Sequence, residues 1–582
     1  MSTNSEAEQL LRKAALINAT RFGGRAEVGS VLGKILSERP DLRKTANELS
    51  RLCVSIVEEV NRLSSSEQRN IVQTQWPEEL VEKEKKREEK ILPPLSNVEK
   101  YPRVVTRFSP NPDGAIHIGS TRAIILCHDY ARMYNGKFIL RFEDTDPRLH
   151  KPVLEFYDSI REDVRWLDCQ WDQEIIQSDR MEIYYHHAKE LLSMGGAYVC
   201  TCSKQNFKTL TLDSRACGCR DLPTSVQLER WEKMINGTFS EEEAIVRVKT
   251  DLNHPNPAVR DWPALRIIDP EKHPHPRVGA KYRVWPLYNF ACGIDDRLLE
   301  ISHIIRGKEH LTNEVRQTYM FTHFGWHYPE TIHYGRLKII GTVLSKSKMV
   351  KMIADGVVSD FADPRLATLS ALRRRGITPG ALRRLVFEIG PRPVDATLSW
   401  DNIFSYNRKL IDPTASRFFF VGDPVELEIA GLPGDFVSNL PLHPDHPEYG
   451  NRQLNVKRTG SISSVFISKD DSKTLSPGDI VRLMELFNVK ISSIEPSKIK
   501  GEFHSQSYQD ARKLDANLIH WLPQDGNINA KLVLPSANII EGLGENAISL
   551  QKIGSIIQLV RVGFGRIDSK TSDSVVVYFA HS

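Results

Sequence analysis

The hydrophobic and polar positions of the first hundred residues follow a helical period. Leucine, valine and isoleucine alternate there with charged residues, and the region ends in VEKEKKREEKILPPL. A charged helix stopped by Pro93 and Pro94 is the simplest interpretation, because proline cannot continue a helix. We therefore expect a helical N-terminal extension over residues 1–100.

From residue 101 the pattern changes to alternating strands and helices. The segments YPRVVTRF, TRAIILCHDYARMYNG and KFILRFEDTD have the order strand, helix, strand, which is the order of a parallel βαβ unit. Cysteine pairs and a proline-rich passage, DPEKHPHPRVGAKYRVWPLY, interrupt this order at about residues 190–285. We interpret that stretch as an insertion in an α/β domain that covers residues 101–412.

The rest of the chain divides into a helical and a β-rich part. Strand and helix patterns resume in LLEISHIIRGKEHLTNEVRQTYMFTHFG, and a basic helical stretch, RLATLSALRRRGITPGALRRLVFEIG, follows. Beyond residue 413 the apolar segments are short and separated by turns, as in SRFFFVGDPVELEIAGLP and SISSVFISKD. Such spacing is typical of all-β structure, so we expect β-barrels over residues 413–582.

Composition narrows the class of protein without identifying it. The 582 residues suffice for several domains, and the net charge of +4 says little about binding partners. The chain has neither a signal-peptide pattern nor an apolar run of eighteen residues, and its eight cysteines are too unevenly spaced for a disulfide framework. We therefore expect a cytoplasmic protein that does not enter a membrane.

The loop PNPDGAIHIGS, residues 110–120, lies between a predicted strand and a predicted helix. Ligands of open α/β sheets bind at this edge, and a helix N-terminus attracts phosphate, so His117 and Gly119 would suit a nucleotide. Neither a P-loop nor a dinucleotide-binding motif is present. Taken alone, this loop could be an ordinary connection between a strand and a helix. The basic stretch GTVLSKSKMVK at 341–351, taken alone, could be an ordinary solvated loop.

Together, the two segments resemble the HIGH and KMSKS motifs of class I aminoacyl-tRNA synthetases. The segments TRFSPNPDG, RFEDTDPR, WPLYNFACGIDD, IIRGKEHL, DPVELEI and LIHWLP are similar to the glutamyl/glutaminyl branch, in the family's order over residues 101–582. Ser120 departs from the fourth HIGH position, and Val343 replaces the first KMSKS lysine. The resemblance implies a Rossmann-type catalytic domain with an acceptor-binding insertion, a helical stem-contact region at about 330–412 and C-terminal anticodon-binding barrels.

The resemblance also implies a two-step reaction. ATP and an amino acid give an aminoacyl-adenylate and pyrophosphate, with Mg²⁺ accompanying ATP, and the acyl group then passes to the terminal adenosine of tRNA. By this resemblance the catalytic residues are His117, Gly119 and Lys346. The expected ATP-binding residues are His117, Gly119, Ser120, Glu309, Leu337, Ser345, Lys346 and Ser347.

The amino-acid contacts implied by the resemblance indicate glutamate. They are Arg107, Asn111, Glu143, Tyr288 and Arg306. A guanidinium has only donors, so Arg306 suits a side-chain carboxylate and offers nothing to the NH₂ group of an amide. The glutaminyl branch lacks this arginine and has aspartate in place of Glu143. An arginine at the surface or facing RNA is the alternative for Arg306, and Cys292 stands where bacterial members have asparagine.

The basic and C-terminal segments suggest tRNA contacts. The β-rich C-terminus resembles the archaeal and eukaryotic type of glutamyl-tRNA synthetase, and Arg408 matches an arginine that reads an anticodon base in the glutaminyl family. Arg374 and Arg375 lie in a run suited to the RNA backbone. A phosphate-binding or structural arginine, and a solvated helix face, are the respective alternatives.

Four cysteines form two close pairs. Cys200, Cys202, Cys217 and Cys219 give a set suited to tetrahedral Zn²⁺ in a reducing compartment. Similar synthetases carry zinc in this insertion. We expect structural zinc here, with four buried free thiols as the alternative.

The predicted function is therefore that of a glutamyl-tRNA synthetase, an ATP-dependent ligase acting on L-glutamate and tRNA-Glu. Charging of tRNA-Gln with glutamate stays open. A glutaminyl-tRNA synthetase, a shortened paralogue that modifies a tRNA base and a non-catalytic tRNA-binding paralogue are the alternatives. We expect a monomer.

Overall fold

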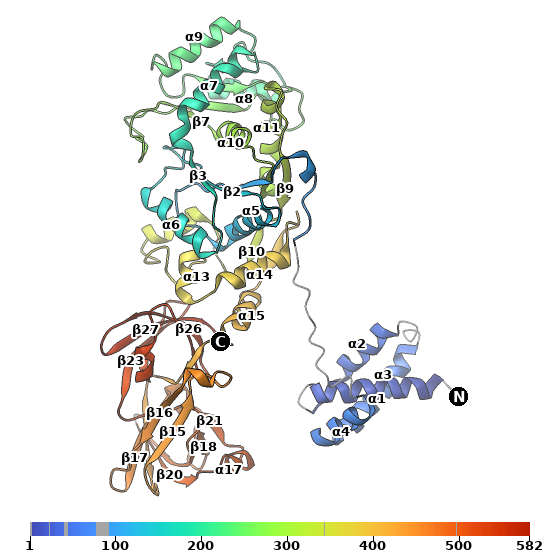
Figure 1. Cartoon of the computed structure of the whole chain (residues 1–582), viewed down its shortest axis with the longest axis vertical. Helices are drawn as coiled ribbons and strands as arrows, with labels where there is room; N and C mark the ends of the chain where they lie inside the picture. Colours follow the sequence, from blue (N-terminus) through green and yellow to red (C-terminus); the bar gives the residue numbers. More distant parts are fainter. Residues whose placement is uncertain (1–2, 22–23, 40–44, 77–91, 343, 496–497) are drawn as a thin grey trace. The chain divides into compact units, whose positions relative to one another are not determined.

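A computed structural model describes the chain except for residues 1–2, 22–23, 40–44, 77–91, 343 and 496–497. The described residues form two compact units, 1–90 and 91–582 (Figure 1). Most of the predicted charged helix VEKEKKREEKILPPL, and Val343, lie outside the described residues.

The first unit consists of helices packed around an apolar core. Their bounds are α1 (Thr3–Arg21), α2 (Val28–Glu38), α3 (Ala46–Arg62) and α4 (Ser65–Gln75). Helix α4 begins with a capping box, in which Ser64 and Glu67 each accept a hydrogen bond from the other's backbone N–H. Buried Gln68 donates to the carbonyls of Val60 and Leu63 and so ties α4 to the end of α3. The helical period of the sequence is thus confirmed in this region.

The second unit is built on parallel strands. Strands β1 (Val105–Phe108), β2 (Lys137–Phe142) and β3 (Gln173–Ile176) pair in that order, connected by α5 (Thr121–Met133) and α6 (Leu154–Trp166). Strand β8 (His303–Gly307) lies on the other side of β1 and pairs in parallel with β9 (Glu330–Tyr334), with α11 (Leu311–His323) between them. The predicted α/β fold is confirmed.

This strand order creates a binding edge. Strand β1 has β2 on one side and β8 on the other. The chain therefore adds β2 and β3 on one side of β1 and later adds β8 and β9 on the opposite side. Ligands of open α/β sheets bind at such a switch point, outside the carboxyl ends of the strands. The loop after β1 and the residues that end β2 and β8 meet at this edge.

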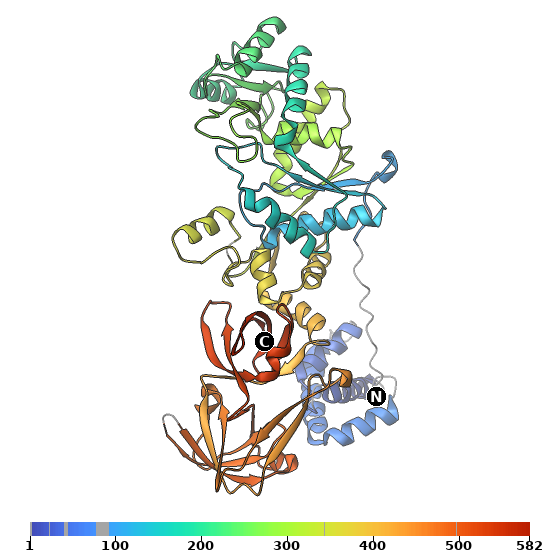
Figure 2. The ribbon, with the colours of Figure 1, turned by 60° about the vertical axis from the view of Figure 1, so that its left-hand side comes forward.

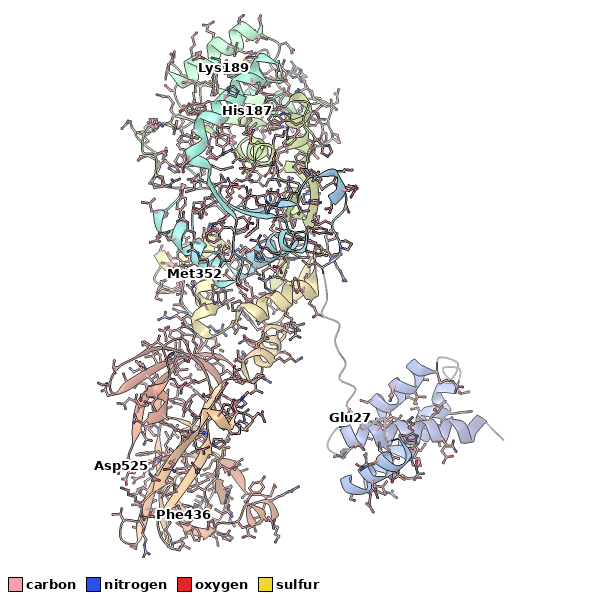
Figure 3. All side chains as sticks on the ribbon, in the orientation of Figure 1. Glu27, His187, Lys189, Met352, Phe436 and Asp525 are labelled. Atoms are coloured by element: carbon pink, nitrogen blue, oxygen red, sulfur yellow. The ribbon has the colours of Figure 1, made fainter. Side chains whose placement is uncertain are left out.

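The predicted insertion contains an antiparallel sheet and helices, drawn in green in Figure 1. The strands, in sheet order, are β4 (Ala197–Cys200), β5 (Ile245–Val248), β6 (Pro263–Ile267) and β7 (Val284–Pro286). The helices around them are α7 (Met181–Ser193), α8 (Lys204–Leu212), α9 (Thr224–Ile235) and α10 (Tyr288–Leu298). Figure 3 marks α7 by His187 and Lys189.

Short helices follow the parallel strands. They are α12 (Lys346–Ala354), α13 (Leu369–Arg375), α14 (Pro379–Ile389) and α15 (Trp400–Ile411), and β10 (Leu337–Ile339) pairs with β11 (Ala396–Leu398) among them. Thr368 and Thr378 cap α13 and α14 with their hydroxyls. The helical pattern of this basic region is confirmed.

The C-terminal region is mostly β (Figure 2). One sheet has the order β12-β25-β26-β27-β23-β24-β13, another β21-β18-β19-β20-β14-β17-β22, and β15 pairs with β16. Only Phe419 separates β12 from β13, and two residues separate β21 from β22. Because a residue spans at most about 3.6 Å, each sheet must curl until its edge strands nearly meet. The expected barrels are thus confirmed.

The strand bounds are β12 (Ser416–Phe418), β13 (Phe420–Gly422), β14 (Val425–Ala430), β15 (Phe436–Pro441), β16 (Asn451–Val456), β17 (Ile462–Ile467), β18 (Ile480–Leu483), β19 (Asn488–Ile494), β20 (Lys498–Ser505), β21 (Asn517–Ile519), β22 (Leu522–Pro523), β23 (Asn527–Val533), β24 (Ile539–Glu545), β25 (Ile556–Leu559), β26 (Gly563–Lys570) and β27 (Ser574–His581). Two short helices, α16 (Lys469–Ser472) and α17 (Tyr508–Lys513), lie between them.

Candidate active site

His117 stands just before α5, where the loop after β1 enters the helix. Its Nδ1 accepts a hydrogen bond from the Gly119 N–H at 3.0 Å, which leaves the proton on Nε2. A Cβ on Gly119 would lie 2.7 Å from the His117 ring, so glycine permits this close turn. Burial and the charge of Lys346 lower the pKa of His117 to about 4. The imidazole is therefore a neutral donor.

Lys346 comes from the start of α12, more than two hundred residues away, and joins the same loop. Its Nζ forms an ion pair with Asp113 and donates to the Asn111 carbonyl at 3.0 Å. A Cβ on Gly114 would lie 2.5 Å from the Lys346 Cε, so a larger residue at position 114 would displace the end of this lysine side chain. The two predicted motifs are thus brought together.

A cavity of about 500 Å³ opens at this edge of the sheet. Its wall contains many of the residues predicted for substrate and nucleotide: Arg107, His117, Gly119, Ser120, Glu143, Tyr288, Arg306, Glu309 and Leu337. A neighbouring cavity of about 680 Å³ shares Glu143 and Tyr288 and includes Asn111 and Lys346. The Ser345 and Ser347 hydroxyls, 3.2 Å apart, line neither of these two cavities.

Arg306 lies near the end of β8, in the wall of the smaller cavity. Its side chain donates to the Gln317 Oε1 and to the Tyr328 hydroxyl, both at 3.0 Å. The Arg306 Nε is buried without a hydrogen-bond partner, and across the described chain no carboxylate lies within 4.0 Å of this guanidinium. A buried cation with an unused donor is suited to an anionic ligand.

Arg107, by contrast, already has a carboxylate partner. Its Nε donates to the Asp296 Oδ1 at 3.0 Å, and Arg141 donates to the same oxygen at 2.7 Å. Burial would raise the pKa of Asp296, but the two guanidinium charges hold it below its usual range. Asp296 therefore holds both Arg107, which lines the smaller cavity, and Arg141.

Glu143 follows β2 and faces both cavities. Its Oε1 accepts hydrogen bonds from the Cys292 thiol at 2.9 Å and from Arg141 at 3.2 Å. Burial raises the pKa of Glu143, although the Arg141 charge opposes the shift. Burial also raises the pKa of the Cys292 thiol, so sulfur is the donor. Cys292, which departs from the bacterial pattern, therefore orients Glu143.

Sequence reasoning missed Arg141, Asp296, Gln317 and Tyr328 as parts of this site. Arg141 carries a signal, because it is a charged residue inside the apolar strand KFILRF. Gln317 carries another, since it lies one turn before buried Met320 and Phe321 on the same face of α11. No local pattern points to Asp296 or Tyr328.

The four cysteines of the insertion converge. Their sulfur atoms all lie within 4.8 Å of one another, with Cys200 and Cys217 3.8 Å apart and Cys202 and Cys219 3.9 Å apart. Four thiolates at 2.3 Å from a tetrahedral zinc would be separated by about 3.8 Å. The hydrogen bond with Cys200 lowers the pKa of Cys217, despite the burial of this thiol. The donor set fits zinc.

The arginines predicted to contact tRNA lie in different environments. Arg375 is buried and donates to the Phe579 and Ala580 carbonyls, so it holds α13 against β27. The expectation that Arg375 faces RNA is corrected, because its guanidinium is enclosed between these elements. Arg374 forms two hydrogen bonds with Asp568, at 3.0 and 2.8 Å, and keeps 31% of its side chain exposed.

Arg408 lies on the exposed side of α15. It donates to the Ser582 carbonyl and leaves much of its side chain accessible.

Among the helices that the structure describes, none is both long and apolar enough to cross a membrane.

Comparisons with known proteins agree with this geometry. The family model "tRNA synthetases class I (E and Q), catalytic domain" matches residues 103–413, and the corresponding anti-codon binding domain matches residues 415–508. The glutamate–tRNA ligase of Pyrococcus furiosus is 51% identical over 581 residues, covering 99% of this chain and 100% of its own length. That of Methanothermobacter thermautotrophicus is 44% identical and covers 99% of both chains. A glutamate tRNA ligase structure from Elizabethkingia meningosepticum is 20% identical, with a TM-score of 0.39 over 54% of this chain and 70% of that one.

Proposed function

The chain belongs to the class I tRNA synthetases of the glutamate and glutamine branch, and we propose that it acts as a glutamate–tRNA ligase in which Arg306 selects the amino acid. One observation carries the choice of glutamate: the buried guanidinium of Arg306 lines the cavity and has no carboxylate partner within the described residues. The side-chain carboxylate of glutamate would supply one. A glutamine amide could offer its oxygen to this group but would leave the charge uncompensated.

In the first step, ATP binds beside the loop after β1. The Nε2–H of His117 donates to an oxygen of the α-phosphate, and the Lys346 ammonium balances the charge that develops as pyrophosphate leaves. Gly119 and Ser120 allow the phosphates to approach the helix N-terminus. Glu309 lies in the cavity wall with 43% of its side chain exposed, and it is the residue that would contact Mg²⁺. When bound, Mg²⁺ would neutralise the charge of the phosphates.

The glutamate occupies the end of the cavity near β8. Its ammonium contacts the Glu143 Oε2, because Oε1 is already engaged by Cys292 and Arg141. The Tyr288 hydroxyl and the nearby Arg107 charge complete the pocket. The α-carboxylate is left free to attack the α-phosphate.

In the second step, a ribose hydroxyl of the terminal adenosine of tRNA attacks the acyl carbon of the adenylate, so that an ester bond forms, the bond to phosphate breaks and AMP leaves. The larger cavity shares Glu143 and Tyr288 with the first, and Pro263 of β6 and Pro286 of β7 form part of its wall. This shared wall supports entry of the tRNA 3′ end between the parallel strands and the insertion. Arg374 and Arg408 are the candidates for contacts to the rest of the tRNA.

We further propose that the insertion holds a structural zinc ion on Cys200, Cys202, Cys217 and Cys219. The sulfur–sulfur distances and the lowered pKa of Cys217 support this site. Zinc supplies a cross-link there and takes no part in the chemistry. None of the eight cysteines forms a disulfide bond, which supports a location in the cytoplasm.

Charging of purified tRNA-Glu and tRNA-Gln with labelled glutamate or glutamine tests the function. We expect glutamate to be attached to tRNA-Glu. The reaction with tRNA-Gln decides whether the enzyme discriminates between the two tRNAs. Attachment of glutamine instead would favour the glutaminyl alternative. Absence of both products and of ATP–pyrophosphate exchange, with tRNA present, would favour a non-catalytic tRNA-binding protein.

A further inference from the structure

Among the residues that the structure describes, only neutral side chains form hydrogen bonds with the Arg306 side chain. Arg306 donates to the Gln317 Oε1 and to the Tyr328 hydroxyl, each at 3.0 Å, and that hydroxyl donates in turn to the same Gln317 oxygen at 2.7 Å. The three side chains form a closed ring of hydrogen bonds. The ring fixes the orientation of the guanidinium and contributes no negative charge.

Gln317 lies in a place where a polar side chain is costly. It is fully buried on α11, and its neighbours Met320 and Phe321 belong to an apolar core. Its Nε2 donates to the Asn289 carbonyl at 3.4 Å, and its oxygen accepts the two bonds of the ring. Burial of an amide is tolerated only when such bonds are made.

The other groups around Arg306 leave its charge uncompensated as well. Asp296 influences it but is ion-paired with Arg107 and Arg141. His310 and His333 are neutral, because burial and the Arg306 charge lower the pKa of each to about 4. The Arg306 charge can therefore be neutralised by an anionic ligand that binds in the cavity.

We propose that Gln317 is a specificity-determining residue, whose neutral amide holds Arg306 in place while reserving its charge for the substrate's side-chain carboxylate. This proposal rests on the proposed role of Arg306. Glutamate at position 317 would have almost the same shape and could accept both bonds of the ring. It would also neutralise Arg306 and repel the substrate's carboxylate.

Steady-state charging with glutamate and with glutamine, on wild type and Gln317→Glu, tests the proposal. We expect kcat/KM for glutamate to fall about a hundredfold, mainly through KM, while KM for ATP changes less than twofold. The rate with glutamine should fall less than tenfold, so the preference for glutamate narrows. The ratio of kcat/KM for glutamate to kcat/KM for glutamine is the decisive measurement, because a purely structural defect would lower kcat/KM for both amino acids alike.

Gln317→Met is the matched control, since methionine has a similar volume but neither the acceptor oxygen nor a charge. It should lower activity about tenfold through looser positioning of Arg306 and should keep the preference for glutamate. A Gln317→Met variant that loses the preference would overturn the role of charge, even where Gln317→Glu proved too unstable to assay.

Two variants separate this proposal from the assignment of Arg306. If Arg306→Leu narrows the preference and a folded Gln317→Glu does not, Gln317 plays no part in selectivity and the function stands. If neither variant changes the preference, the assignment of Arg306 itself is overturned. Thermal melting of each variant establishes that it is folded.

Discussion

Replacement of Arg306 by leucine is the most direct test of amino-acid selection. The change removes the uncompensated guanidinium from the cavity wall and introduces an apolar side chain. Gln317 and Tyr328 retain their own hydrogen bond of 2.7 Å, so the supporting structure loses little. Arg107 cannot replace the missing charge, because Asp296 already holds it.

The expected magnitude follows from the burial of Arg306, which is only 5% exposed. Loss of one partner from a buried, hydrogen-bonded charge pair costs about 2–5 kcal/mol, or roughly thirty- to several-thousand-fold in kcat/KM for glutamate. The value of kcat/KM for glutamine should fall far less, because the glutamine amide makes no ion pair with Arg306. The ratio of the two kcat/KM values should therefore fall.

The assay is steady-state charging with each amino acid, together with KM for ATP. KM for ATP should stay within about twofold, since His117 and Lys346 are unchanged. Arg336→Leu is a matched control, because Arg336 lines the same cavity, with 63% of its side chain exposed and beside Glu309. It should leave the amino-acid preference intact. An unchanged ratio in Arg306→Leu would refute the assignment and reopen the glutaminyl alternative.

Four other predictions address the rest of the site. Cys292→Ala should raise KM for glutamate about tenfold by removing a hydrogen bond to Glu143, and Cys292→Ser should restore most of it; equal KM values in all three proteins would exclude the thiol. Arg408→Ala should cost about 1–3 kcal/mol in kcat/KM and relax the preference at one anticodon base, whereas Arg374→Ala should weaken all tRNAs alike; identical losses on cognate and anticodon-mutant tRNA would argue against base reading by Arg408. Elemental measurement should find one zinc per chain, and chelator-washed protein that lacks zinc yet charges normally would disprove a structural ion. Burial lowers the pKa of His117 from 6.5 to about 4, so its contribution to stability is present above pH 6.5 and is lost as the pH falls toward 4; melting curves at pH 7 and 4.5 should show a smaller acid loss in His117→Asn, and an equal loss would contradict this.

The alternation of strands and helices sufficed to predict the α/β fold, and the short apolar segments separated by turns sufficed to predict the β-rich C-terminus. The comparisons confirm the family that the HIGH-like and KMSKS-like segments indicated. The resemblance also singled out His117, Lys346 and Arg306, of which His117 and Arg306 line the smaller cavity and Lys346 lines the larger one. The roles of these residues stay predictions until the variants are measured.

Arg375 shows where local pattern reasoning fails. Its place in ALRRRGITPG is typical of an exposed basic helix, but β27 and the Trp400 and Phe404 rings of α15 enclose its guanidinium. Sequence spacing cannot distinguish an arginine that faces solvent from one covered by a segment two hundred residues later. The same limitation hid Asp296 and Tyr328.

The sequence by itself determined the elements, the chemical groups and the family, because helix and strand periods and short motifs are local properties. Tertiary structure decided which charges remain free. Arg107 and Arg306 are both buried arginines near the ends of parallel strands. Within the described part of the chain, Arg107 is paired with Asp296, whereas Arg306 is hydrogen-bonded only to the neutral Gln317 and Tyr328. That difference depends on contacts between residues far apart in the chain, and a buried charge binds a substrate only where the fold has left it uncompensated.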